Sequence, residues 1–331
     1  MTRTVLLATC AAVSLGAAPL HAQTMAADTV GTPQERAQAM LEQMTTEEKL
    51  LLVKGYFGTD FPPAQFIAPP EARQGSAGYV PGIARLGIPP QWQADAGIGV
   101  ASQGGARDKR GRTALPSGLA VAASWDQQIA HEGGRMIGRQ ARADGFNVML
   151  AGSVNLIREP RNGRNFEYAG EDPLLAGVIA GEAIRGIQSN DIVSTAKHYA
   201  LNAQETDRGQ VDAVIDEAAF RMSDLLAFEI AMEIGNPGSV MCAYNKVNGD
   251  WACENRFLLT QVLREDWGWP GYVMSDWGAA HTTAKSANAG LDQESGFGLQ
   301  RADHYGAALA EAVRTGEVSG ERLDLMAGRI L

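Results

Sequence analysis

Cysteine and histidine are scarce in this chain of 331 residues, which has three of the first and five of the second. The histidines are scattered, and none stands in a metal-ligand spacing such as His-Glu-x-x-His, which argues against a metal-dependent hydrolase. We expect no cofactor. Lys and Arg number 28 against 38 Asp and Glu, a net charge of −10. An acidic chain of this kind argues against nucleic acid and anionic membranes as partners.

Long apolar stretches are also missing, apart from one near the N-terminus. Arg3 gives this segment a positive start, residues 5–18 are apolar, and Ala22 offers a small residue for cleavage. The run is too short to span a bilayer, and no other stretch is a candidate membrane span. The pattern is typical of an export signal, so we expect residues 1–22 to be removed and the mature protein to be periplasmic or secreted. A buried N-terminal helix is the alternative.

Removal of the signal leaves two cysteines, Cys242 and Cys253, in a chain bound for an oxidising compartment. They flank the turn-like segment 245–249, so a strand–turn–strand could bring them together. We expect a disulfide bond between them, and two reduced, buried cysteines are the alternative.

Helix and strand signals alternate along the rest of the chain. The patterns predict helices at 46–53, 125–143, 174–187 and onward from Asp216, and strands at 146–150, 192–196, 239–243 and 271–274. In the helix after Asp216 we expect Ala219, Met222, Leu226 and Ile230 to form the buried stripe. The Gly- and Pro-rich segment 55–90 is typical of a loop.

Alternating helices and strands favour parallel strands joined by helices. Polar or charged residues follow the strands, and active sites of β/α barrels lie at the carboxyl ends of the strands. We therefore predict one α/β domain over 23–331, a (β/α)8 TIM-barrel-like fold whose first strands are irregular. A doubly wound open sheet is the second choice, because no Gly-rich dinucleotide fingerprint follows the first strand.

An acid follows the last predicted strand in the segment 271–279. Asp276 directly succeeds the apolar residues of this strand, and Trp277 stands beside it. An isolated Asp at such a position is commonly a helix cap or a solvated loop acid. Here the strand would hold the carboxylate rigidly, and the indole offers an aromatic wall for a sugar ring. The segment therefore indicates a carbohydrate site.

Arginines and acids alternate in the segment 157–173 and predict a network of ion pairs. We expect Arg164, Glu167 and Glu171 to build this scaffold without touching a ligand. Arg158 lies nearest the end of the preceding strand and is the candidate ligand, because the fork of donors on a guanidinium suits adjacent hydroxyl groups.

A Lys-His pair ends the strand predicted at 192–196. A single such pair is weak evidence, since lysine is usually solvated. Lys197 and His198 are followed by Asn202, Glu205 and Arg208, which together predict an inward-facing polar cluster.

Together these segments resemble glycoside hydrolase family 3. The resemblance covers nearly the whole mature chain and rests on residues 44–49, 85–89, 95, 158–173, 197–198, 241–245 and 273–277. It implies that Asp276, in Ser-Asp-Trp, is the catalytic nucleophile. It also implies that the terminal sugar is held by Asp95, Arg158, Lys197, His198 and Tyr244, in a pocket also lined by Met241 and Trp277.

The activity that the resemblance implies is that of a retaining, exo-acting β-glycosidase. Such an enzyme would hydrolyse terminal β-glucosyl residues of β-glucosides and oligosaccharides through a covalent glycosyl-enzyme intermediate. A β-xylosidase or mixed-specificity glycosidase and a catalytically silent sugar-binding barrel are the alternatives.

Retaining hydrolysis also needs an acid/base group. The loop histidine that single-domain N-acetylglucosaminidases of the family use is missing after Lys197-His198. We therefore expect this group to be a Glu beyond Leu331, in a C-terminal α/β sandwich domain absent from this chain.

Overall fold

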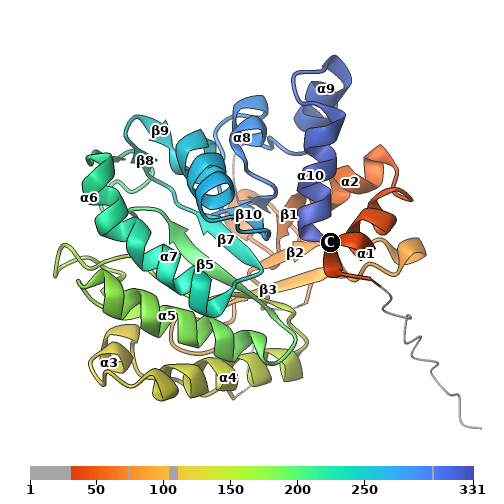
Figure 1. The fold of residues 1–331 in the computed structure, drawn as a ribbon. Helices are drawn as coiled ribbons and strands as arrows, with labels where there is room; N and C mark the ends of the chain where they lie inside the picture. The colour runs from red at the N-terminus through yellow and green to blue at the C-terminus, as the bar shows by residue number, and fades with distance from the viewer. Residues whose placement is uncertain (1–30, 74, 104–110, 300–301) are drawn as a thin grey trace, which may run out of the picture.

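The computed structural model describes residues 31–73, 75–103, 111–299 and 302–331 (Figure 1). The predicted export signal, residues 1–22, lies outside these ranges. Within them, no helix has both the length and the apolar composition needed to span a membrane.

Eight strands form the central sheet, in the order β10-β7-β5-β4-β3-β2-β1-β11. Their bounds are β1 Lys54–Phe57, β2 Gly78–Val80, β3 Gln91–Asp95, β4 Val148–Leu150, β5 Val193–Tyr199, β7 Ser239–Cys242, β10 Tyr272–Ser275 and β11 Glu294–Phe297. The sheet curls until its two end strands meet at a parallel bridge between Met274 and Gln293. This arrangement confirms the predicted barrel.

The first strands are irregular, as expected, because β2 runs antiparallel to both β1 and β3. The prediction of a loop over 55–90 is wrong, since β1 and β2 both lie there. These strands are four and three residues long, and Lys54 of β1 pairs with Glu294 of β11. Strands this short contain too few residues for an alternating pattern to be detected, and the β11 partner of β1 lies near the other end of the chain.

Helices cover the outside of the barrel (Figure 1). Their bounds are α1 Pro33–Leu41, α2 Thr46–Leu52, α3 Gly118–Ala122, α4 Gln127–Asp144, α5 Pro173–Gln188, α6 Glu217–Met222, α7 Asp224–Gly235, the π-helix η6 Phe257–Asp266, α8 Ala284–Ala289, α9 Ala307–Thr315 and α10 Gly320–Ile330. Side-chain caps begin several of them: Thr45 with Glu48 forms a capping box for α2, and Asp172 caps α5.

The stretch predicted as one helix after Asp216 is two helices, because the backbone of Ser223 leaves the helical region between α6 and α7. The expected stripe is wrong as a result. Met222 is 74% exposed, whereas Phe220 and Phe228 are fully buried. The break rotates the second helix relative to the first, so a single helical period does not describe the buried face.

Candidate active site

A cavity of about 420 Å³ opens at the carboxyl ends of the barrel strands, and we call it the strand-end cavity. Its walls consist of Ala77, which precedes β2, and of residues from the ends of seven other barrel strands or the loops that follow them: Phe57, Phe61, Asp95, Gln103, Leu150, Arg164, Lys197, His198, Arg208, Met241, Tyr244, Asp276, Trp277 and Leu299. This is the end of a β/α barrel where active sites lie. The structure thus brings together seven of the eight residues predicted to form the site.

Most of the charged residues lie in one sector of this cavity. They come from β3, β5 and the loops after β4 and β5, whereas Asp276 follows β10. Phe57, Phe61, Trp277 and Leu299 lie in another sector, because they come from β1 or from the loops after β1, β10 and β11, which are neighbours across the barrel closure. One side of the cavity can therefore bind hydroxyl groups, and the other offers an aromatic surface.

Asp276 lies at the floor of the cavity, one residue beyond β10. Its backbone N–H donates to the Cys242 carbonyl at 3.2 Å, and its Oδ1 accepts the Trp277 N–H at 2.8 Å. Burial raises the pKa of this carboxyl above its usual value. The Arg164 and Lys197 charges, a hydrogen bond from the Tyr244 hydroxyl and the Trp277 N–H act against that effect. The result is a fixed, desolvated carboxylate that faces a cavity.

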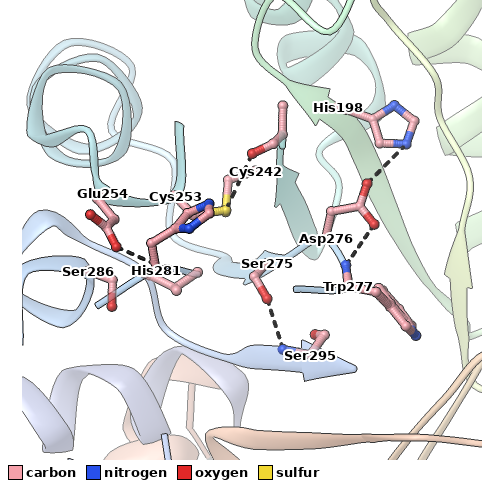
Figure 2. The surroundings of a disulfide bond; sticks show 12 residues. His198, Cys242, Cys253, Glu254, Ser275, Asp276, Trp277, His281, Ser286 and Ser295 are labelled. Atoms are coloured by element: carbon pink, nitrogen blue, oxygen red, sulfur yellow. Dashed lines mark hydrogen bonds and ion pairs between the residues drawn. A yellow bond between two sulfur atoms is a disulfide. The ribbon is translucent and has the colours of Figure 1, made fainter. Parts of the chain in front are cut away.

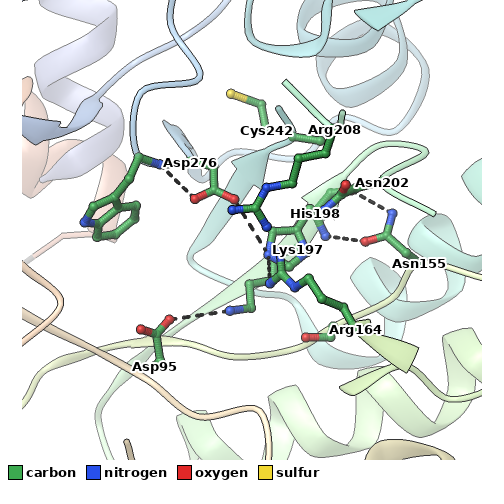
Figure 3. A network of polar contacts seen from close by, with 12 residues as sticks. Asp95, Asn155, Arg164, Lys197, His198, Asn202, Arg208, Cys242 and Asp276 are labelled. Carbon is green, nitrogen blue, oxygen red and sulfur yellow. Dashed lines mark hydrogen bonds and ion pairs between the residues drawn. The ribbon is translucent and has the colours of Figure 1, made fainter. Parts of the chain in front are cut away.

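Arg164 and Lys197 share a buried carboxylate, Glu167, beside Asp276. The Arg164 Nε donates to Glu167 at 2.5 Å, and Lys197 Nζ lies 3.9 Å from Glu167. Figure 3 shows the Lys197 ammonium facing Asp95, which lies 3.6 Å away. Burial of Glu167 is outweighed by these two cations and by the Ser153 hydroxyl, so its pKa is lowered. The network therefore holds two cationic groups rigidly at the cavity wall.

His198 stands between this network and Asp276. The Asn155 side chain makes two hydrogen bonds to the His198 backbone: it accepts the N–H at 2.7 Å and donates to the carbonyl at 2.9 Å. Arg164 Nη2 lies 2.7 Å from His198 Nε2, and Asp276 Oδ2 lies 3.8 Å from the same nitrogen. Burial and the charges of Arg164, Lys197 and Arg208 lower the pKa of His198 well below its usual value. The contact with the Arg164 guanidinium, which is a donor only, likewise requires an unprotonated Nε2.

Arg158 does not line the strand-end cavity, so its predicted placement is wrong. Its side chain is 47% exposed, borders a separate hollow, and pairs with the fully buried Asp224 at the start of α7. Arg164, which we expected only in the scaffold, lies in the cavity. Arg164 directly precedes the short 3₁₀ helix Asn165–Glu167, a turn whose Glu167 accepts the Arg164 Nε–H and so holds the guanidinium. We chose Arg158 over Arg164 because it lies nearer the strand end in sequence, and this criterion does not detect the turn.

The remaining scaffold residues differ in their roles. Glu167 is buried in the network, as expected, whereas Glu171 is exposed at the surface. Arg208 is a lining residue that the sequence indicated only as part of a cluster, and its guanidinium lies 4.3 Å from the centre of the Tyr244 ring. Phe61, Gln103 and Leu299 had no signal in the sequence, because their loops lie outside the recognisable motifs.

The Cys242–Cys253 disulfide bond lies directly behind the nucleophile candidate (Figure 2). Both cysteines are fully buried, and their Cα atoms are 5.2 Å apart. Since the Cys242 carbonyl accepts the Asp276 N–H, the bond ties the loop after β7 to the strand end that supports Asp276. In the described ranges, no cluster of three or more His, Cys, Asp or Glu side chains is arranged to hold a metal ion.

Comparison with known proteins identifies relatives across nearly the entire described chain. The model for the glycosyl hydrolase family 3 N-terminal domain matches residues 37–331. Beta-glucosidase B of Emericella nidulans is 40% identical over 299 residues, which are 89% of this chain and 32% of the relative. Beta-glucosidase BoGH3A of Bacteroides ovatus is 37% identical over 317 residues, which are 89% of this chain and 39% of that protein.

Solved structures of beta-glucosidases also resemble this chain over most of its length. Beta-glucosidase 3B from Thermotoga neapolitana, determined in complex with glucose, superposes with a TM-score of 0.82 at 35% identity. The match covers 89% of this chain and 42% of that chain. The chain thus spans between a third and somewhat over two fifths of the length of these relatives.

Proposed function

The chain belongs to glycoside hydrolase family 3, and from this premise we propose that it forms the nucleophile-bearing part of a retaining β-glycosidase that removes terminal β-glucosyl residues. The observation that carries the proposal is the position of Asp276. A desolvated carboxylate on the floor of a cavity, with hydroxyl-binding groups on one wall, is suited to attack a sugar carbon held above it.

The polar wall is assigned to the terminal sugar. Lys197 and Arg164 donate to its hydroxyl groups, and the Asp95 carboxylate accepts from them. His198 Nε2 and the Tyr244 hydroxyl lie close to Asp276 and are assigned to the edge of the sugar next to the reacting carbon. Charge-assisted hydrogen bonds of this kind contribute about 1.5–3 kcal/mol each.

The reaction proceeds by two displacements. An Asp276 oxygen attacks the anomeric carbon, the bond from that carbon to the leaving oxygen breaks, and the leaving oxygen takes a proton from an acid group. Water then attacks the same carbon and gives its proton to that group, which releases the sugar and restores Asp276. Two inversions retain the β configuration.

The acid/base group is proposed to lie outside the strand-end cavity of this chain. Two carboxylates, Asp95 and Asp276, are among the described residues that line it. Asp95 accepts the Gln103 amide at 2.8 Å and faces Lys197, an arrangement suited to binding hydroxyl groups as a carboxylate. The acid/base group is therefore assigned to the portion of the longer relatives that this chain does not match.

Covalent labelling tests the proposal. In a 2-deoxy-2-fluoro β-glucosyl fluoride, the anomeric fluoride leaves without being protonated. This reagent is therefore expected to leave one sugar covalently bound to the protein. Peptide mapping should place this sugar on Asp276, and Asp276→Ala should abolish the label. A label on another carboxylate, or undiminished labelling of Asp276→Ala, would show that the nucleophile is a different residue.

A further inference from the structure

The side chain of Trp277 is held at both of its ends by the barrel backbone. At its far end, the indole Nε1–H donates to the Ala77 carbonyl at 3.1 Å. A Cβ on the next residue, Gly78 of β2, would lie 3.1 Å from the indole Cζ2, so this edge of the ring lies against the strand. Because its one N–H donor is used within the protein, the indole offers only apolar surface to the strand-end cavity.

Gly296 of β11 contacts the other end of the side chain, next to the Trp277 backbone. It is buried, and its φ of +89° lies in a region that glycine adopts readily and other residues rarely do. A Cβ on Gly296 would lie 2.9 Å from three Trp277 atoms, Cβ, Cγ and Cδ1, which is much closer than carbon atoms pack. Rotation of the indole cannot relieve the contact with Cβ, which is bonded directly to the backbone. Trp277 therefore has room only because residue 296 has no side chain.

Hydrogen bonds on both sides hold β11 beside the end of β10. The Ser295 N–H donates to the Ser275 Oγ at 2.9 Å, and Figure 2 shows this bond close to Asp276 and Trp277. The Glu294 N–H donates to the Val53 carbonyl at 3.0 Å, which ties the same strand to the segment before β1. A side chain at position 296 should consequently displace Trp277 rather than separate the strands.

Displacement of Trp277 would change the surroundings of Asp276. The Cβ and the backbone nitrogen of Trp277 are bonded to the same Cα atom, and this N–H donates to Asp276 Oδ1 at 2.8 Å. We propose that Gly296 is a positioning residue, whose lack of a side chain leaves room for Trp277 and so keeps the Trp277 N–H on the Asp276 carboxylate. The packing follows from the contacts alone, whereas its effect on catalysis rests on the function proposed above.

Gly296→Ala in the full chain tests the proposal. We expect the second-order rate of labelling by 2-deoxy-2-fluoro β-glucosyl fluoride to fall about tenfold, the effect of losing one hydrogen bond to a charged group. Labelling needs an ionised Asp276, and loss of the Trp277 N–H should raise the pKa of this carboxyl. The acidic limb of the pH–rate profile should therefore move to higher pH. The other groups that face Asp276 keep their identity in this variant: Arg164, Lys197, His198 and Tyr244.

Gly316→Ala is the matched control. Gly316 has a φ of +81°, and a Cβ there would meet no atom within 4 Å apart from its own chain neighbours. Both substitutions impose the backbone strain of an alanine in this region, and of the two only Gly296→Ala also clashes with Trp277. Gly316→Ala should label at the wild-type rate with the wild-type pH profile. Equally lowered rates in the two variants, or a wild-type rate and profile in Gly296→Ala, would overturn the proposal.

The position of the indole can be followed directly by ¹⁹F NMR of protein labelled with 5-fluorotryptophan. The Trp277 signal is assigned by its loss in Trp277→Phe. It should shift in Gly296→Ala and stay in place in Gly316→Ala. An unshifted Trp277 signal in Gly296→Ala would show that residue 296 does not position this side chain.

Trp277→Gly keeps the proposal testable if Gly296→Ala alone does not fold, because it removes all three contacted atoms. In the Trp277→Gly background, Gly296→Ala imposes only the backbone strain, so it should lower the midpoint of urea unfolding less than it does in wild type. Equal losses in the two backgrounds would refute the packing argument. If the Trp277 signal shifts as expected but the covalent label falls on a carboxylate other than Asp276, the proposed function fails and the positioning of Trp277 by Gly296 stands.

Discussion

Removal of Arg164 should expose how strongly the cavity wall depends on one cation. The Arg164 side chain is 19% exposed and that of Glu167 is 4% exposed, so their pair is largely out of water. Truncating one partner of a buried pair costs about 3–5 kcal/mol, because the other charge stays buried. Glu167 would keep Lys197 at 3.9 Å and the Ser153 hydroxyl at 3.1 Å. We therefore expect Arg164→Ala to lower the free energy of unfolding by about 3 kcal/mol, the lower end of that range.

The assay is urea unfolding of the full chain, with the midpoint compared at unchanged slope. Arg161→Ala is the matched control, since Arg161 lies in the same loop, pairs with Glu159 and is 88% exposed. An exposed pair of this kind contributes about 0–1 kcal/mol. Adding Glu167→Gln to Arg164→Ala should recover part of the loss, because it removes the unpaired charge. Equal losses for the two arginines, or a double variant that loses the sum of the single losses, would refute this account of the network.

Burial raises the pKa of Asp276, so its ionisation costs stability above that pKa, and the cost disappears below the unfolded pKa of about 3.9. Asp276→Asn should therefore melt above wild type at neutral pH, and the difference should close in acid; a constant difference would contradict this. Replacing Cys242 and Cys253 by Ser should lower the free energy of unfolding by about 3 kcal/mol, and equal stability with and without the bond would exclude a structural role. Arg158→Ala should destabilise the fold, by leaving its buried carboxylate partner unpaired, and spare the rate of labelling by 2-deoxy-2-fluoro β-glucosyl fluoride. Lys197→Ala should lower that second-order labelling rate about tenfold or more, and equal labelling rates in both variants would contradict the two placements.

The sequence revealed the parts of the site that follow directly from the central strands. Lys197, Tyr244 and Asp276 come at or just beyond the ends of β5, β7 and β10, and parallel strands place such positions at one rim. The resemblance to a family added Asp95 at the end of β3. For these residues, order along the chain and position in space agree.

The arginines show where that agreement ends. Arg158 and Arg164 lie six positions apart in one loop, and the nearer to the strand is the one that faces outward. Their directions depend on where the loop turns and on the buried acids, Glu167 and Asp224, that pair with each of them. Partner choice of this kind is a tertiary property, and local pattern does not encode it.

The closure of the barrel sets the order in which the site can be completed during synthesis. Asp276 follows β10, which has β7 on one side and, on the other, meets β11 through the bridge at Gln293. The strand β11 pairs in parallel with β1, and the Gln293 side chain also donates to the Leu52 carbonyl, 241 residues earlier. Contacts of such separation form late in folding. On the ribosome, the nucleophile therefore gains its last supporting neighbours only when the first strand of the barrel meets one of the last segments to be made.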